Sequence, residues 1–145
     1  MLAYFCKYVP EELMQAFGTE FVCLEPHVTN FTQADALMHP NMCSFSKAVL
    51  EEFEKQDYEG MIFTSCCDSS RRLYDILCQQ FPDKFFFCLD LPRKINDFAV
   101  TLYTKQLQKL IEAYAAFSGK TFSEQKLLEI CKKRATSANI QPSSA

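Results

Sequence analysis

The sequence predicts an α/β fold, in which a parallel β-sheet of about four strands carries helices on both faces. Two observations lead to this prediction. Short apolar runs alternate along the chain with segments of helical periodicity, as in strand–helix–strand units with parallel strands. The run over residues 60–65 is apolar throughout, which is typical of a strand buried on both faces. With 145 residues, 48% of them apolar, the chain can bury a hydrophobic core.

The strands are predicted from four short apolar runs: residues 2–5, 21–25, 60–65 and 84–92. Pro92 closes the last run, because proline has no N–H group to offer a neighbouring strand. The segment 26–43 contains two prolines and two asparagines and is expected to be mostly loop.

The helices are predicted over five segments: residues 10–17, 45–58, 68–81, 96–118, and from Thr121 or Ser123 to about 134. Pro10 is placed at the first helical position of the first segment, which ends at Gly18. Asp68 is the predicted N-cap of the third segment, and Gly119 ends the fourth.

The chain is expected to form a single domain over residues 1–136, followed by a polar tail over residues 137–145. No internal repeat and no linker divides it. The formal net charge is -3 and no basic run is longer than residues 132–134, so nucleic acid is not an expected partner. Only three glycines are present, which argues against a glycine-rich nucleotide loop.

The sequence indicates neither a membrane segment nor a secretion signal. No apolar stretch approaches the roughly 20 residues that a membrane-spanning helix needs. The first apolar run is short and is interrupted by Lys7 and Pro10, unlike a signal peptide. We therefore expect a cytoplasmic chain with reduced thiols and no contact with a membrane.

Eight cysteines are many for such a chain, and they fall into two groups. Four lie inside predicted strands or helices and are expected to be small buried side chains: Cys23, Cys78, Cys88 and Cys131. Four lie at the ends of predicted elements: Cys6, Cys43, Cys66 and Cys67. The carboxyl ends of parallel strands meet at one edge of a sheet, where such folds hold their chemistry. The second group, with residues 90–93 after the fourth strand, is therefore the candidate site.

The two adjacent cysteines of this group stand directly before the predicted helix 68–81. A helix N-terminus lowers the pKa of a thiol and stabilises the thiolate, which is the form that binds iron or zinc. Neighbouring side chains diverge, so one of the pair is the expected ligand, and Cys67 projects nearer the helix axis. The spacing is not a CxxC pair, so no compact zinc knuckle is indicated, and buried or incidental thiols remain the alternative. Arg71 and Arg72 either contact a phosphate or carboxylate or form a solvated helix face.

Four segments of the chain resemble successive motifs of one family: "YFCKYVPEEL" (4–13), "ADALMHPNMCSFSKAVL" (34–50), "FTSCCDSSRRLYD" (63–75) and "FFFCLDLPRK" (85–94). The family is that of the 2-hydroxyacyl-CoA dehydratases. It includes the 2-hydroxyglutaryl-CoA dehydratase D component, benzoyl-CoA reductase subunits and double-cubane cluster proteins. The order and approximate spacing of the motifs agree, and the resemblance runs from about residue 2 to residue 118.

The resemblance implies Rossmann-like domains and an oxygen-sensitive, anaerobic iron–sulfur protein. It implies a [4Fe-4S] cluster held by three cysteines per subunit, a second dehydratase subunit and a separate ATP-hydrolysing activator that injects one electron. The substrate would be an acyl-CoA: the reduced cluster passes the electron to the thioester carbonyl of a 2-hydroxyacyl-CoA. The resulting ketyl radical expels the hydroxyl group, so the family's lyases remove water without net redox change.

The resemblance also assigns residues. Cys43 and Cys67 match two of the three cluster ligands, and Cys66 is an alternative ligand. The third ligand of the family lies far downstream in another domain. A serine follows Cys43 where the family often has proline, and the doublet extends a motif that usually has a single cysteine.

Three further residues are expected to be neighbours of the active site: Cys6, Asp68 and Arg71. The chain is therefore expected to be a [4Fe-4S] component, a truncated subunit or a fragment, that is inactive by itself. A non-catalytic remnant or partner-binding module with structural cysteines is the alternative. A thiol-redox protein that uses the adjacent cysteines is the third hypothesis. The sequence leaves the acyl substrate and the oligomeric state open.

Overall fold

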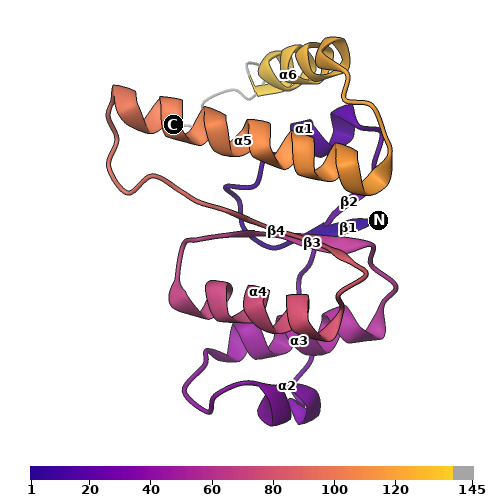
Figure 1. The fold of residues 1–145 in the computed structure, drawn as a ribbon, viewed down its shortest axis with the longest axis vertical. Coiled ribbons are helices and arrows are strands. Elements are labelled where there is room, and N and C mark those ends of the chain that lie inside the picture. Colours follow the sequence, from indigo (N-terminus) through magenta and orange to yellow (C-terminus); the bar gives the residue numbers. More distant parts are fainter. Residues whose placement is uncertain (139–145) are drawn as a thin grey trace, which may run out of the picture.

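The computed structural model describes residues 1–138, which build a four-stranded sheet with helices on both faces (Figure 1). The strands are β1 (Leu2–Tyr4), β2 (Phe21–Cys23), β3 (Gly60–Thr64) and β4 (Phe85–Leu89). They lie in the order β2-β1-β3-β4, and every pair is parallel. This confirms the predicted α/β, Rossmann-like fold class.

The helices form two layers, one on each face of the sheet (Figure 1). They are α1 (Glu11–Ala16), α2 (Thr32–Leu37), α3 (Ser44–Lys55), α4 (Asp68–Gln80), α5 (Asp97–Ser118) and α6 (Glu124–Ala138). α1, α5 and α6 lie on one side of the sheet, and α2, α3 and α4 lie on the other, with α2 outermost (Figure 1). Within residues 1–138, no helix combines the length and the apolar character that a membrane span requires.

The core has two halves because alternate residues of a strand point to opposite faces. Ala3, Met61 and Phe63 pack with α3 and α4, whereas Leu2 and Ile62 pack with α1 and α5. Each fully buried aliphatic or aromatic side chain contributes about 1.5–3 kcal/mol. All five residues of β3 are buried, which confirms the prediction from its unbroken apolar sequence.

The prediction that four cysteines are buried is wrong. Cys23 is exposed and Cys88 is half-buried, because β2 and β4 are the edge strands of the sheet. Cys78 on α4 is half-buried, and Cys131 is exposed on α6, a helix without a buried residue. Membership of an apolar run therefore did not distinguish central elements from peripheral ones.

Several elements differ from the predictions. α3 ends at Lys55 rather than at residue 58, and β4 ends at Leu89, so Pro92 lies beyond the strand that it was predicted to close. Pro10 is the N-cap of α1 rather than its first helical residue. α2 lies inside the segment 26–43 that was predicted to be mostly loop. α6 ends at Ala138 rather than near residue 134, so it includes the first two residues of the predicted tail, and residues 139–145 lie outside the described part.

Candidate functional site at the carboxyl edge of the sheet

The connections of the sheet create a crevice at its carboxyl edge. From β1 the chain crosses to the outer strand β2, and then returns past β1 to β3 on the other side. Parallel sheets bind ligands at such a switch point, outside the carboxyl ends of the two strands. Cys6 follows β1, and the Cys66–Cys67 doublet follows β3, so the sequence placed these thiols at the correct edge.

Cys43 and Cys67 occupy equivalent positions, each as the N-cap of a helix. The Cys43 sulfur accepts the backbone N–H of Ser46 in α3 at 3.4 Å. The Cys67 sulfur accepts the backbone N–H of Ser70 in α4, also at 3.4 Å. The prediction of Asp68 as N-cap is therefore wrong, because the thiol takes that position and Asp68 becomes the first helical residue.

The two capping thiols belong to helices that contact each other, although 24 residues separate them in the sequence. The side chain of Ser69, in the first turn of α4, is one of the groups that lower the pKa of the Cys43 thiol. The charge of Cys43 in turn acts on the pKa of Cys67. Both side chains are exposed, so an external group has access to them.

The pKa of the Cys43 thiol lies below its ordinary value. Burial acts to raise this pKa, but several hydrogen bonds outweigh burial. They come from the side chain and backbone of Ser46, from the Ser69 side chain and from the Phe45 backbone. Each of these bonds stabilises the thiolate.

The pKa of the Cys67 thiol is raised instead. Burial is the largest cause, and the backbone N–H of Ser70 opposes it. The neighbouring thiols of Cys66 and Cys43 raise this pKa further, because a like charge nearby disfavours the thiolate. The expectation that the start of α4 lowers the pKa of the Cys67 thiol is therefore wrong.

At neutral pH, Cys43 is expected to react with iodoacetamide severalfold faster than Cys67, because a lower pKa leaves more of a thiol as thiolate. The difference should shrink as the pH rises above both pKa values. Alkylation followed over time by peptide mass spectrometry measures both rates in one sample. The exposed Cys131 on α6 serves as the reference thiol. Faster alkylation of Cys67 would contradict the order of the two pKa values.

The remaining predicted site residues lie around these thiols. Cys66 is exposed beside Cys67, and both are free thiols. Cys6 is half-buried and packs against the core half formed by α1 and α5. Arg71 lies 3.9 Å from Asp90, so the carboxylate that it meets is one of the chain's own.

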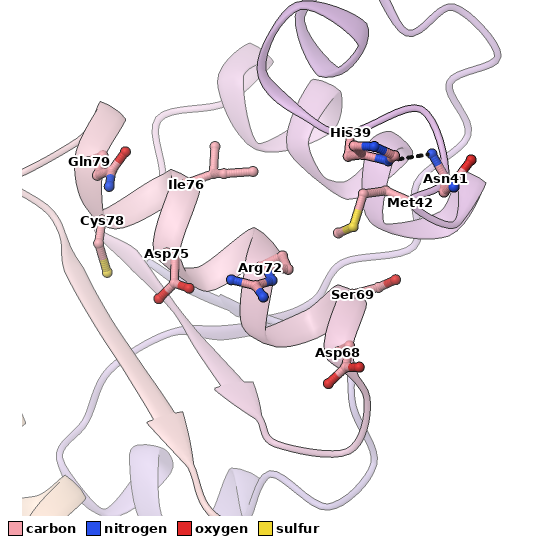
Figure 2. A pocket seen from close by; sticks show the side chains of 10 residues that line it. All are labelled: His39, Asn41, Met42, Asp68, Ser69, Arg72, Asp75, Ile76, Cys78 and Gln79. Atoms are coloured by element: carbon pink, nitrogen blue, oxygen red, sulfur yellow. Dashed lines mark hydrogen bonds between the residues drawn. The ribbon is translucent and has the colours of Figure 1, made fainter.

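A groove of about 890 Å³ runs beside the capping thiols. Figure 2 shows that one wall comes from the loop over residues 39–42 and the other from one side of α4. His39, Met42 and Arg72 line it, with Asp68 at the end next to Cys67. The sequence indicates Arg72 as a candidate contact for a phosphate or carboxylate, but it does not reveal that Arg72 shares a groove with His39 and Met42. No local pattern marks two distant segments as the walls of one groove.

The described residues do not contain a complete donor set for an iron–sulfur cluster. Within residues 1–138, no group of three or more His, Cys, Asp or Glu side chains has an arrangement suited to a metal ion. Cubane clusters in proteins are usually held by four thiolates. Cys43 and Cys67 can therefore account for at most two of the four positions, and the described residues do not form a complete cluster site.

Comparison with known proteins adds independent information. The sequence profile of the family described as "2-hydroxyglutaryl-CoA dehydratase, D-component" matches residues 6–140. The chain is also 26% identical, over 133 residues, to a benzoyl-CoA reductase subunit from Thauera aromatica. That match covers 88% of this chain but 34% of the relative, so the chain spans about a third of the length of the relative that it matches. The chain thus belongs to the 2-hydroxyglutaryl-CoA dehydratase D-component family.

Proposed function

We propose that the chain is a component of a 2-hydroxyacyl-CoA dehydratase-type lyase, and that Cys43 and Cys67 are two thiolate ligands of its [4Fe-4S] cluster. The observation that supports this most directly is the pair of exposed thiols that cap neighbouring helices. Helix N-termini carry a partial positive charge, which favours the negative charge of a thiolate-bound cluster. Family membership supports the same assignment.

The proposal gives the described residues a limited task. They hold two sulfurs at the carboxyl edge of the sheet, and protein outside residues 1–138 supplies the rest of the cluster ligands. A second dehydratase subunit and an ATP-dependent activator are the proposed partners, an acyl-CoA is the proposed substrate, and the cytoplasm is the proposed location. Cys66 remains the proposed alternative ligand because it lies next to Cys67.

Anaerobic reconstitution with iron and sulfide tests the proposal. A small thiol such as 2-mercaptoethanol is added to fill the ligand positions that residues 1–138 leave open. Cys43→Ser and Cys67→Ser are each expected to weaken iron binding by at least about tenfold. Loss of a residue that only orients a metal ligand typically lowers metal affinity by about 10- to 100-fold, and loss of the ligand itself should have at least that effect. Cys131→Ser, on the exposed face of α6, is the matched control. If the Cys43 and Cys67 variants bind as much iron as the parent, the assignment is wrong.

One observation favours a second candidate, a partner-binding module of the same family with structural cysteines. This is the incomplete donor set within the described residues. In that case the parent chain, Cys43→Ser and Cys67→Ser would all stay free of cluster in the same experiment.

A further inference from the structure

A second cavity, of about 930 Å³, lies at the carboxyl edge and is distinct from the groove of Figure 2. We call it the switch-point pocket. It is formed by the segments that follow β1, β3 and β4, together with α1, α5 and α6. The two cavities have no lining residue in common, so a ligand of one need not disturb the other.

The position of this pocket follows from the strand order. β1 and β3 are neighbours, and the chain leaves β1 toward one side of the sheet but reaches β3 on the other. The pocket opens outside the carboxyl ends of these two strands: Lys7 follows β1, while Ser65 and Cys66 follow β3. Ligands of parallel sheets bind in crevices at this kind of location.

Three cations line the pocket, and one of them is already neutralised. Arg134 of α6 forms ion pairs with both Glu11 and Glu12 at the start of α1. Among residues 1–138, Lys7 and Arg93 form no ion pair. The pocket therefore has an excess of positive charge on a chain whose formal net charge is -3.

Glu11 and Glu12 also line the pocket, and both are paired with Arg134. A third carboxylate, that of Asp90, is engaged elsewhere. Asp90 follows β4 directly and precedes Leu91, the first lining residue of that segment, but it is not part of the pocket lining. It accepts a hydrogen bond from the Ser65 hydroxyl at 2.6 Å and lies 3.9 Å from Arg71 on the other side of the sheet edge. Lys7 and Arg93 are thus the cations that remain for an external anion. The planar guanidinium of Arg93 can donate two hydrogen bonds to a pair of oxygens on one carboxylate or phosphate.

Apolar side chains stand next to these cations. Leu91, Pro92 and Ile95 line the pocket, and the Ile95 side chain is fully exposed at 105% of its reference area. Tyr103 of α5 also lines the pocket, and its hydroxyl donates to the Tyr8 carbonyl oxygen at 2.9 Å. A cavity with an apolar lining and a few convergent charged groups is the usual form of a small-molecule site.

We propose that the switch-point pocket binds a small organic anion. A phosphate or carboxylate of the ligand lies between Lys7 and Arg93, and its apolar part packs on Leu91, Pro92 and Ile95. The inference depends on the pocket and its two cations, so it stands whether or not Cys43 and Cys67 bind a cluster. Coenzyme A, which carries phosphates and no carboxylate, and hexanoate, which carries a carboxylate on an apolar chain, distinguish the two sources of the anion.

Isothermal titration calorimetry of the metal-free chain with each probe tests the inference. At least one probe is expected to bind the parent chain. Lys7→Gln and Arg93→Gln should each weaken that binding about tenfold, because each removes one charge-assisted contact to the anion. Lys94→Gln, which changes a neighbouring exposed residue outside the pocket, and Arg72→Gln, which changes the groove of Figure 2, are the matched controls and should bind as the parent does.

The inference is overturned if neither probe binds the parent, or if the Lys7 and Arg93 variants bind as tightly as Lys94→Gln. A thermal melt of each variant shows that it is folded, which the exposed positions of these side chains favour. A Cys43→Ser/Cys67→Ser double variant separates the two proposals. If this double variant loses iron binding but still binds the anion, the result supports both the cluster ligands and the anion pocket. If the parent chain binds iron through its cysteines but binds neither probe, the pocket inference alone is overturned.

Discussion

Gly60→Ala is expected to prevent folding or to lower the free energy of unfolding by more than about 4 kcal/mol. Gly60 begins β3, and an added Cβ would stand 1.8 Å from the carbonyl oxygen of Phe85 in β4. The carbonyl carbon and Cα of Phe85 would lie at 2.6 and 2.9 Å. All three atoms belong to the backbone, so no side-chain rotation relieves the overlap, and the β3–β4 pairing would have to open at its first residue. Circular dichroism and urea unfolding measure the effect.

Gly119→Ala is the matched control for this prediction. Gly119 follows α5 with a φ of +68°, and an added Cβ meets no atom within 4 Å. Its cost is limited to the left-handed backbone conformation, about 1–2 kcal/mol. A Gly60→Ala chain that unfolds at the same urea concentration as the parent would show that Gly60 and Phe85 are not paired as described.

Glu51→Ala is expected to detach α2 from α3 and to lower the free energy of unfolding by about 2–4 kcal/mol. The Glu51 side chain is 7% exposed, and its Oε1 accepts the backbone N–H groups of Gln33 at 2.6 Å and Ala34 at 2.9 Å. α2 has six residues, and Phe31 at its N-cap offers no side-chain hydrogen bond. Loss of the carboxylate leaves these two N–H groups without their acceptor. Urea unfolding gives the change in stability, and amide hydrogen exchange at Gln33 and Ala34 reports the release of α2 directly.

Glu51→Gln is the control, because the glutamine carbonyl can still accept from the same N–H groups. It is expected to cost about 1 kcal/mol. The exposed Asp35–Lys47 ion pair, with 2.7 Å between its atoms, also joins α2 to α3, but such pairs contribute about 0–1 kcal/mol. Unchanged exchange at Gln33 and Ala34 in Glu51→Ala would mean that packing alone holds α2. Because residues 39–42 follow α2, its release should also loosen one wall of the groove beside Cys43.

The layout of the fold was predictable because it depends on short-range patterns. Unbroken apolar runs marked the four strands, and caps such as Gly119 ended helices where expected. α2 was missed because its start is stabilised by Glu51, which lies 18 residues from Gln33 in the sequence. Buried cysteines were predicted wrongly because the pattern of one strand does not reveal whether it lies at the edge of a sheet.

The candidate site was predictable in outline. Strand ends located Cys6, Cys66 and Cys67, and they located Arg93 within residues 90–93. The same rule would have drawn attention to Lys7, which also follows a strand. The pKa difference between the capping thiols was not predictable, because it depends on neighbours from other segments. The roles of Cys43 and Cys67 as cluster ligands remain predictions.

The sequence by itself determined which segments become strands and most of the helices, and that several thiols stand at element ends. Periodicity, caps and backbone preferences act over a few residues, so they can be read along the chain. Only the tertiary structure decided that Cys43 and Cys67 cap neighbouring helices, and that Lys7 and Arg93 line one pocket. These relations join residues that are distant in the sequence, and they exist because the crossover connections bring strand ends and helix starts to one edge of the sheet.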